Sequence, residues 1–245
     1  MKSLGIVWGA LVVAIALLAS AIPPVNAAPL TVPTGLAVGT QYRLAFVTSG
    51  TTDAVSTDIN TYNSFVTAQA NLVSELSALA TTWKAIASTL TTAARDNTGT
   101  NITVPGNTGV PIFLLDGTKL ADDNADLWDG SVDNPLNVDQ NGATLNTDVW
   151  ANTDVWAGTR FDGTNNAFAV LGNVSGGNFA FLARSDSTGT TWVQQSGSDS
   201  TSALHSLYAL SDVLTVQAVD EPGAMLIFGI GLAGMALARR QRITA

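Results

Sequence analysis

The distribution of hydrophobic residues divides the chain into three parts. A nearly uninterrupted apolar run occupies residues 4–22, and a second one, which carries no charge, occupies residues 223–238. Between them, short apolar segments are separated by Asp, Asn, Gly, Ser and Thr, residues that favour turns. This pattern predicts a loop-rich α+β domain over residues 28–219 that lies between two apolar terminal segments.

Within the middle part, the periodicity predicts one long helix and several short strands. Residues 41–49 alternate as a strand does, and residues 83–87 form a short buried segment. Between these two segments, apolar residues recur at three- and four-residue steps, which predicts an amphipathic helix over residues 57–80 with its cap at Ser56. We expect this helix to pack on short, mostly antiparallel strands. The other strand candidates are residues 110–115, 148–158, 166–172, 178–183, 190–194 and 206–217.

The N-terminal apolar run has the three parts of a secretory signal peptide. Lys2 supplies the positive charge that precedes the apolar region, and the small residues Val25 and Ala27 stand where signal peptidase requires them. We therefore expect residues 1–27 to be removed by cleavage between Ala27 and Ala28. The alternative is a retained membrane anchor, for which the run is barely long enough.

The C-terminal apolar run predicts a single transmembrane helix over residues 223–238. As a helix these residues span about 24 Å, which is short of a hydrocarbon core of about 30 Å. Local thinning of the bilayer and snorkelling of the arginines that follow allow such a helix to insert. The arginine-rich tail over residues 239–242 would stay cytoplasmic, which leaves the preceding domain outside. Its arginines are Arg239, Arg240 and Arg242.

The arrangement of this C-terminus resembles a known sorting signal. An Asp220-Glu221-Pro222 tripeptide, a short Gly-rich apolar segment and an arginine cluster are similar to the PEP-CTERM signal of Gram-negative bacteria. In that family a membrane-embedded exosortase cuts near a Pro-Glu-Pro tripeptide, whose first proline is Asp220 here. The resemblance implies a sorting signal over residues 220–245, a transient inner-membrane anchor, and transfer to the cell surface, the exopolysaccharide or the medium. The alternative is a permanent C-terminal anchor.

Charge is distributed unevenly between the three parts. The whole chain has 10 Lys and Arg against 19 Asp and Glu, a net charge of -9. Residues 28–222 hold only 6 of the basic residues but all 19 acidic ones, so the exported region carries -13. A region this acidic is not a general binder of nucleic acid or of anionic membranes. The chain has no cysteine, which excludes disulfides, thiolate metal sites and cysteine nucleophiles.

Oxygen-rich segments make calcium the metal that the sequence favours. One acidic cluster consists of Asp122, Asp123, Asn124 and Asp126. A second segment has ligand types at the first, third, fifth and twelfth positions of an EF-hand loop, although no amphipathic helix precedes it. Its candidate ligands are Asn137, Asp139, Asn141 and Asp148. The hypothesis is a loose calcium site, and the alternative is that these residues form turns and solubilise the surface.

Residues 146–157 are a perfect tandem repeat of Asn-Thr-Asp-Val-Trp-Ala. Because the period is even, Trp150 and Trp156 would lie on the same side of a strand. The two rings would either form a face on which a carbohydrate stacks or be buried in the core. We favour burial, because aromatic rings contribute large apolar areas and usually serve cores.

A wider resemblance covers residues 41–217. The order of short motifs, among them residues 43–49, 127–130 and 156–159, resembles an uncharacterised group of exported proteins that commonly carry the PEP-CTERM tail. The order of elements is also similar to C-type-lectin-like and endostatin-like domains. The cysteines usual in many of those domains and their sugar-binding triplets are missing, so no lectin site is carried over to this chain.

Signals for catalysis are few. His205 is the only histidine, no serine lies in a G-x-S-x-G motif, and nothing in the spacing selects a pair of aspartates. We interpret His205 as an ordinary half-buried or surface residue. The sequence therefore favours a non-catalytic protein of the cell surface or extracellular matrix, associated with exopolysaccharide and binding carbohydrate and calcium. The alternative is a secreted hydrolase that uses aspartate carboxylates.

Overall fold

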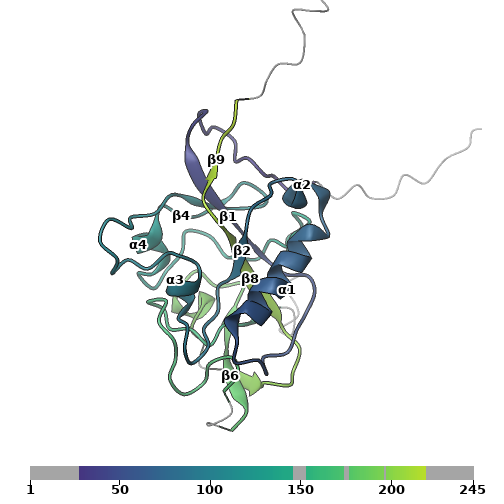
Figure 1. Ribbon diagram of the computed structural model, residues 1–245, viewed down its shortest axis with the longest axis vertical. Coiled ribbons are helices and arrows are strands. Elements are labelled where there is room, and N and C mark those ends of the chain that lie inside the picture. Colours follow the sequence, from purple (N-terminus) through teal and green to yellow (C-terminus); the bar gives the residue numbers. More distant parts are fainter. Residues whose placement is uncertain (1–27, 146–152, 174–176, 196, 219–245) are drawn as a thin grey trace, which may run out of the picture.

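A pair of buried antiparallel strands forms the middle of the sheet (Figure 1). The computed structural model describes residues 28–145, 153–173, 177–195 and 197–218. Strand β1 (Gln41–Val47) pairs with β8 (Ser206–Ser211), with Ala45 opposite Leu210. Every residue of β1 after Gln41 is buried, Arg43 included, because other elements cover both faces of this strand.

The other strands attach to the two edges of this pair. On the free edge of β1 lie β3 (Ile112–Leu114) and, beyond it, β4 (Lys119–Ala121). The short β9 (Leu214–Thr215) follows β8 and pairs with the first residues of β1, so it continues the antiparallel ladder of β8. The far edge of β8 is shared by β5 (Asp154–Trp156) and β2 (Trp83–Ala85). Beyond β5 come β6 (Phe179–Arg184) and β7 (Ser198–Ser200). Only the β1–β3 and β5–β8 pairings among the named strands are parallel, so the expectation of a mostly antiparallel α+β fold is confirmed.

Helix α1 (Ile59–Asn71) lies against this sheet, next to β2 and β8 (Figure 1). The predicted helix over residues 57–80 is wrong in both its cap and its length. Asp58 caps it, because its carboxylate accepts a hydrogen bond from the Asn60 amide at 2.9 Å. The helix stops at Asn71, and Val73 has an extended backbone that starts a separate short helix, α2 (Ser74–Ser77). The break lets the side chain of Val73 reach the core, whereas Leu72, which lies within the predicted helix, is 73% exposed.

Several strand predictions differ from the structure in an informative way. Residues 166–172 form turns with a single bridge between Leu171 and Thr89. The segment 190–194 contains a 3-10 helix, η2 (Thr190–Trp192), that buries Trp192. The segment 206–217 divides into β8 and β9. Short helices α3 (Ala94–Asn97) and α4 (Asn124–Leu127) arise where Asp, Asn and Thr offer local hydrogen bonds to the backbone.

Aromatic side chains fill the space on both sides of the sheet. Trp83 meets the edge of Phe46, with ring centroids 5.0 Å apart. On the β5–β8 side, Trp192 lies between Trp128 and Tyr208, at centroid distances of 5.8 and 6.1 Å. These rings are almost fully buried, and their contacts supply much of the apolar burial of a chain that has no disulfide.

The predicted terminal segments cannot be compared with this structure. The signal peptide over residues 1–27 and the transmembrane helix over residues 223–238 lie outside the described residues. Within the described part of the chain, no helix has the length and apolar character needed to cross a bilayer.

The position of β8 between three partner strands leads to a stability prediction. Leu210 is fully buried on β8, opposite both Ala45 and Lys84. Leu210→Ala should lower the free energy of unfolding by about 2–5 kcal/mol, because it removes buried methyl groups and leaves a cavity. Urea unfolding followed by tryptophan fluorescence measures the change. Leu204→Ala is the matched control, since Leu204 is 64% exposed and the same substitution there should stay within about 0.5 kcal/mol.

Candidate functional site

The single histidine lies at the point where β5, β7 and β8 approach one another. His205 Nε2 is 3.0 Å from a carboxylate oxygen of Asp199, and the imidazole stands edge-on to Trp156 with ring centroids 4.6 Å apart. The carbonyl of Thr52 accepts hydrogen bonds from the His205 amide at 3.1 Å and from Trp156 Nε1 at 3.0 Å. The imidazole is therefore held in place by an aromatic ring, a carboxylate and its own backbone.

A second carboxylate stands close to this histidine. Asp154 pairs in register with Arg184, and its Oδ1 is buried without a hydrogen-bond partner among the described residues. Burial raises the pKa of Asp154, against the opposing charges of His205 and Arg184. The hydrogen bond from His205 lowers the pKa of Asp199, and that from Arg184, whose Nε lies 2.8 Å from Asp186 Oδ1, lowers the pKa of Asp186.

These opposed pKa shifts make the cluster suited to acid–base chemistry, which the sequence did not reveal. When the environments of two carboxylates move their pKa values apart, the one with the raised pKa is suited to hold a proton. The one with the lowered pKa stays ionised and is suited to accept a proton. Asp154, Asp199 and His205 are far apart in the chain or separated by turn residues, so no spacing rule selects them. The signal that could have found them is the position of Asp154 in an apolar strand, where an acidic residue is unexpected.

The two tryptophans of the tandem repeat have different outcomes. Trp156 is fully buried in β5, so of the two interpretations left open, burial in the core applies to it. Its ring offers no surface on which a sugar could stack. Trp150 lies outside the described residues.

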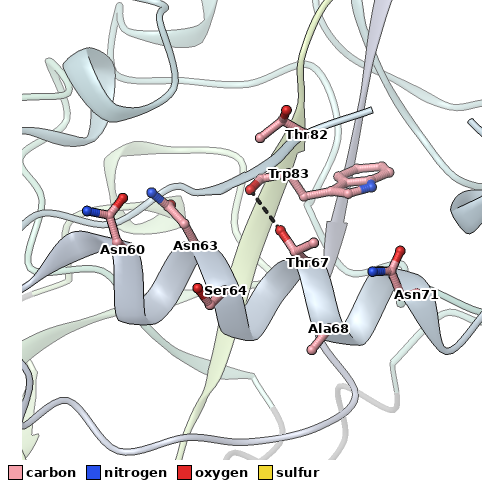
Figure 2. Close-up of a pocket in the computed structure, with 8 residues that line it drawn as sticks. All are labelled: Asn60, Asn63, Ser64, Thr67, Ala68, Asn71, Thr82 and Trp83. Carbon is pink, nitrogen blue, oxygen red and sulfur yellow. Dashed lines mark hydrogen bonds between the residues drawn. The ribbon is translucent and has the colours of Figure 1, made fainter. Parts of the chain in front are cut away.

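A neutral groove runs along α1 (Figure 2). Its volume is about 410 Å³, and none of the eight residues that line it is charged. Asn60, Asn63, Thr67 and Asn71 project from one side of the helix toward residues 82–83, because they recur every three or four residues. Asn63 and Thr67 are engaged by the protein itself: Asn63 Oδ1 accepts from the Ala85 amide at 2.9 Å, and Thr67 donates to the Trp83 carbonyl at 3.2 Å. Asn60 is exposed, and its Nδ2 donates to Asp58 Oδ1 at 3.0 Å. The exposed amide of Asn71 and hydroxyls of Ser64 and Thr82 remain at the surface of the groove.

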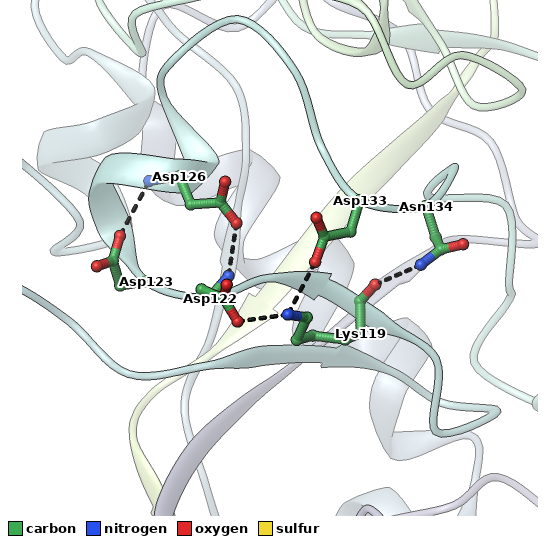
Figure 3. A network of polar contacts seen from close by, with 6 residues as sticks. All are labelled: Lys119, Asp122, Asp123, Asp126, Asp133 and Asn134. Atoms are coloured by element: carbon green, nitrogen blue, oxygen red, sulfur yellow. Dashed lines mark hydrogen bonds and ion pairs between the residues drawn. The ribbon is translucent and has the colours of Figure 1, made fainter.

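The predicted acidic cluster around residue 122 is assembled differently from the sequence expectation (Figure 3). Carboxylate oxygens of Asp122, Asp126 and Asp133 lie within 4.8 Å of one another, and Lys119 forms ion pairs with Asp122 and, at 3.0 Å, with Asp133. These two hydrogen bonds raise the pKa of Lys119. The ammonium group therefore supplies the positive charge that this cluster needs.

The remaining members of that cluster have structural partners. Asp123 caps α4 by accepting hydrogen bonds from the amides of Ala125 and Asp126 at 2.8 and 2.9 Å. Asn124 is buried, and its Nδ2 lies 3.2 Å from the Asn107 carbonyl oxygen. Asp123 thus caps a helix and Asn124 links the start of that helix to the loop at Asn107, and calcium binding by this cluster stays a prediction.

The loop that resembles the start of an EF-hand is organised by one carboxylate. Asp139 is buried; its Oδ1 accepts from the amides of Asn141 and Ala143 at 2.8 and 3.0 Å, and its Oδ2 accepts from Asn141 Nδ2 at 3.0 Å. Asn137 lies at the start of the same turn, and its amide donates to the Pro135 carbonyl at 3.0 Å. Asp148, the fourth candidate ligand, lies outside the described residues, so calcium binding by this set stays a prediction.

Comparison with known proteins identifies the C-terminus. A family model for the PEP-CTERM protein-sorting motif matches residues 221–242. The match includes Glu221, Pro222 and the arginine cluster, and it begins one residue after Asp220. No curated protein matches the chain.

The chain therefore carries the sorting motif of exosortase substrates, as the resemblance in its sequence implied. This motif indicates an exported protein that is sorted through an exosortase and whose C-terminus associates with the membrane. The motif lies outside the described residues, and the C-type-lectin-like character of the exported domain is not confirmed.

The opposed pKa shifts predict opposite pH dependences for two substitutions. A carboxyl whose folded pKa is raised stabilises the fold at low pH and loses that contribution as pH rises through the folded pKa. Asp154→Asn should therefore gain stability relative to the parent protein between pH 3 and pH 7. Asp199, whose pKa is lowered, has the opposite sign, so Asp199→Asn should lose relative stability over the same interval. Urea unfolding at both pH values measures this; trends of the same sign for both variants would contradict the assignment.

Proposed function

We propose that this chain is an exported, non-catalytic protein of the cell surface or extracellular matrix that associates with exopolysaccharide. Signal peptidase removes residues 1–27, the C-terminal helix holds the protein transiently in the inner membrane, and an exosortase processes the tail. The observation that carries this proposal is the sorting motif at residues 221–242. The charge of -13 on residues 28–222 supports a soluble, exposed domain, since net charge far from zero keeps proteins dispersed.

The groove on α1 supports a polysaccharide ligand (Figure 2). Sugar hydroxyls both donate and accept hydrogen bonds, and so do the side-chain amides and hydroxyls of Asn60, Ser64, Asn71 and Thr82. The volume of about 410 Å³ is in the range of small-molecule sites and would take one or two sugar rings. The ring of Trp83 is buried, so recognition there proceeds by hydrogen bonds rather than by stacking.

Calcium is a separate part of the proposal. Of the candidate ligands, Asn137, Asp139 and Asn141 lie in a loop where Asp139 is already engaged by backbone amides, so a bound ion would use the remaining lone pairs of Asp139 and the neighbouring oxygens. The groove on α1 has no carboxylate among its lining residues. Carbohydrate binding at the groove is therefore expected to be independent of calcium.

A second candidate function is a secreted hydrolase that uses aspartate carboxylates. The observation that favours it is the juxtaposition of His205 with Asp199 and Asp154, whose pKa values shift in opposite directions. Turnover of a polysaccharide by the purified protein, lost in Asp154→Asn, would establish this function and remove the non-catalytic one. Binding without turnover would do the reverse.

The sorting proposal predicts the chemical form of the mature protein. In a host that contains an exosortase, the surface protein should lack the peptide that ends at Ala245, whereas Pro222→Ala should retain it. Asp220→Pro, which completes the family's tripeptide, should be processed at least as fully as the parent protein. Mass spectrometry of C-terminal peptides measures all three. Recovery of intact peptides ending at Ala245 from the parent surface protein would show that the tail is a permanent anchor.

The ligand proposal predicts that a bulky side chain in the groove weakens binding. Ala68 is exposed and lines the groove, so Ala68→Trp should weaken binding to an immobilised glycan by about tenfold or more, which corresponds to about 1.4 kcal/mol. Ala78→Trp is the matched control, because Ala78 is exposed just after α2 and outside the groove lining. A glycan array probed with and without calcium gives the measurement. Equal effects of both variants, or binding that disappears with a chelator, would exclude the groove as the site.

A further inference from the structure

The last residues that the domain holds by backbone hydrogen bonds lie close to the start of the sorting motif. Strand β9 pairs with the first residues of β1, with Leu214 opposite Tyr42. Val216 then accepts a hydrogen bond from the Gly39 amide and donates one to the Thr40 carbonyl, both at 2.9 Å, and its side chain is buried. We call the part of the surface formed by residues 36–42 and 213–218 the β9 end. In Figure 1 it lies at the opposite end of the molecule from β6.

The chain between this end and the membrane is short. Six residues separate Val216 from Gly223, where the apolar run begins. Even fully extended, this connection spans at most about 25 Å. Part of that length, about 5–8 Å, is needed to cross the headgroup layer. A domain of this size is about 40 Å across, so a tail inserted in the bilayer holds the β9 end nearest to the lipid.

The composition of the β9 end suits this position. Residues 28–42 and 213–218 contain no Asp, Glu, Lys or Arg, in a region that otherwise carries 25 charged residues. Val38 is 66% and Val213 42% exposed at this end. Asp212 borders it, and its charge acts on Arg43. An uncharged surface avoids both the repulsion between an acidic domain and lipid phosphates and the loss of hydration that a charge would suffer there.

We infer that the β9 end is a membrane-apposed surface, which rests on the headgroup layer while the C-terminal tail is in the bilayer. The occupant of this surface is the lipid itself. The inference rests on the proposed sorting function, because only an inserted tail brings the domain to the membrane. It adds an orientation: the end of the molecule that carries Leu204 is held away from the bilayer during sorting. One side of the groove on α1 lies beside the β9 end, since the carbonyl of Thr82 accepts a hydrogen bond from the Asp212 amide at 2.9 Å.

The absence of cysteine from the chain allows a direct test. Single substitutions Val38→Cys and Leu204→Cys place the same fluorophore at two exposed positions at opposite ends of the β1–β8 pair. The full chain, tail included, is reconstituted in vesicles of phosphatidylcholine and phosphatidylglycerol that contain a headgroup-labelled quencher. Quenching at Val38 should exceed quenching at Leu204 several-fold, and Gly-Ser insertions after Gln217 should reduce the difference.

A third label separates the two proposals. Ala233→Cys reports on the tail through a quencher in the acyl chains. If Ala233 is quenched while Val38 and Leu204 are quenched equally, the orientation is wrong although the tail inserts. If Ala233 is not quenched, the membrane step of the proposed sorting fails, and this inference fails with it. Strong quenching at Ala233 and Val38, with weak quenching at Leu204, supports both.

Discussion

The antiparallel ladder between β1 and β8 is the interaction on which the other contacts of the sheet depend. Where the regular ladder ends, side-chain hydroxyls complete it. The Leu44 amide donates to the Ser211 hydroxyl and the Leu207 amide to the Thr48 hydroxyl, both at 2.9 Å. A buried amide without a partner would be costly, so these two hydroxyls are as necessary as the backbone pairs between them. Strands β2 and β5 find an edge to bind only because this pair is in place.

Neutral amides perform much of the cross-linking that ion pairs or disulfides provide elsewhere. Asn63 on α1 and Asn97 on α3 form reciprocal hydrogen bonds at 2.9 and 2.8 Å. The same two side chains bind the amide and the carbonyl of Ala85 on β2, at 2.9 and 2.8 Å. Helix α1, strand β2 and helix α3 are thus joined by one closed set of bonds. A fully satisfied network of this kind fixes a unique arrangement without burying a charge.

The features that the sequence could reveal are those that depend on local pattern. The alternation in residues 41–47 identified β1, and the apolar run with its arginines identified the sorting motif. The length of α1 could not be read in the same way, because Val73 continues the apolar spacing while its backbone leaves the helix. The neighbours of His205 were equally inaccessible, since Asp154 reaches it only through the parallel pairing of β5 with β8.

Strand β8 lies in the middle of the sheet, yet only β9 follows it in the sequence. Strand β8 ends at residue 211, and the sorting motif begins at residue 221. The strands on both sides of β8 come earlier in the sequence, and they can pair with β8 only once it is present. A chain that emerges from the export machinery N-terminus first cannot close its sheet until this strand has passed through. A truncated chain lacks both the strand and the motif. The last strands and the sorting motif therefore emerge together. A chain that has been translated as far as the sorting motif also contains every strand of the sheet.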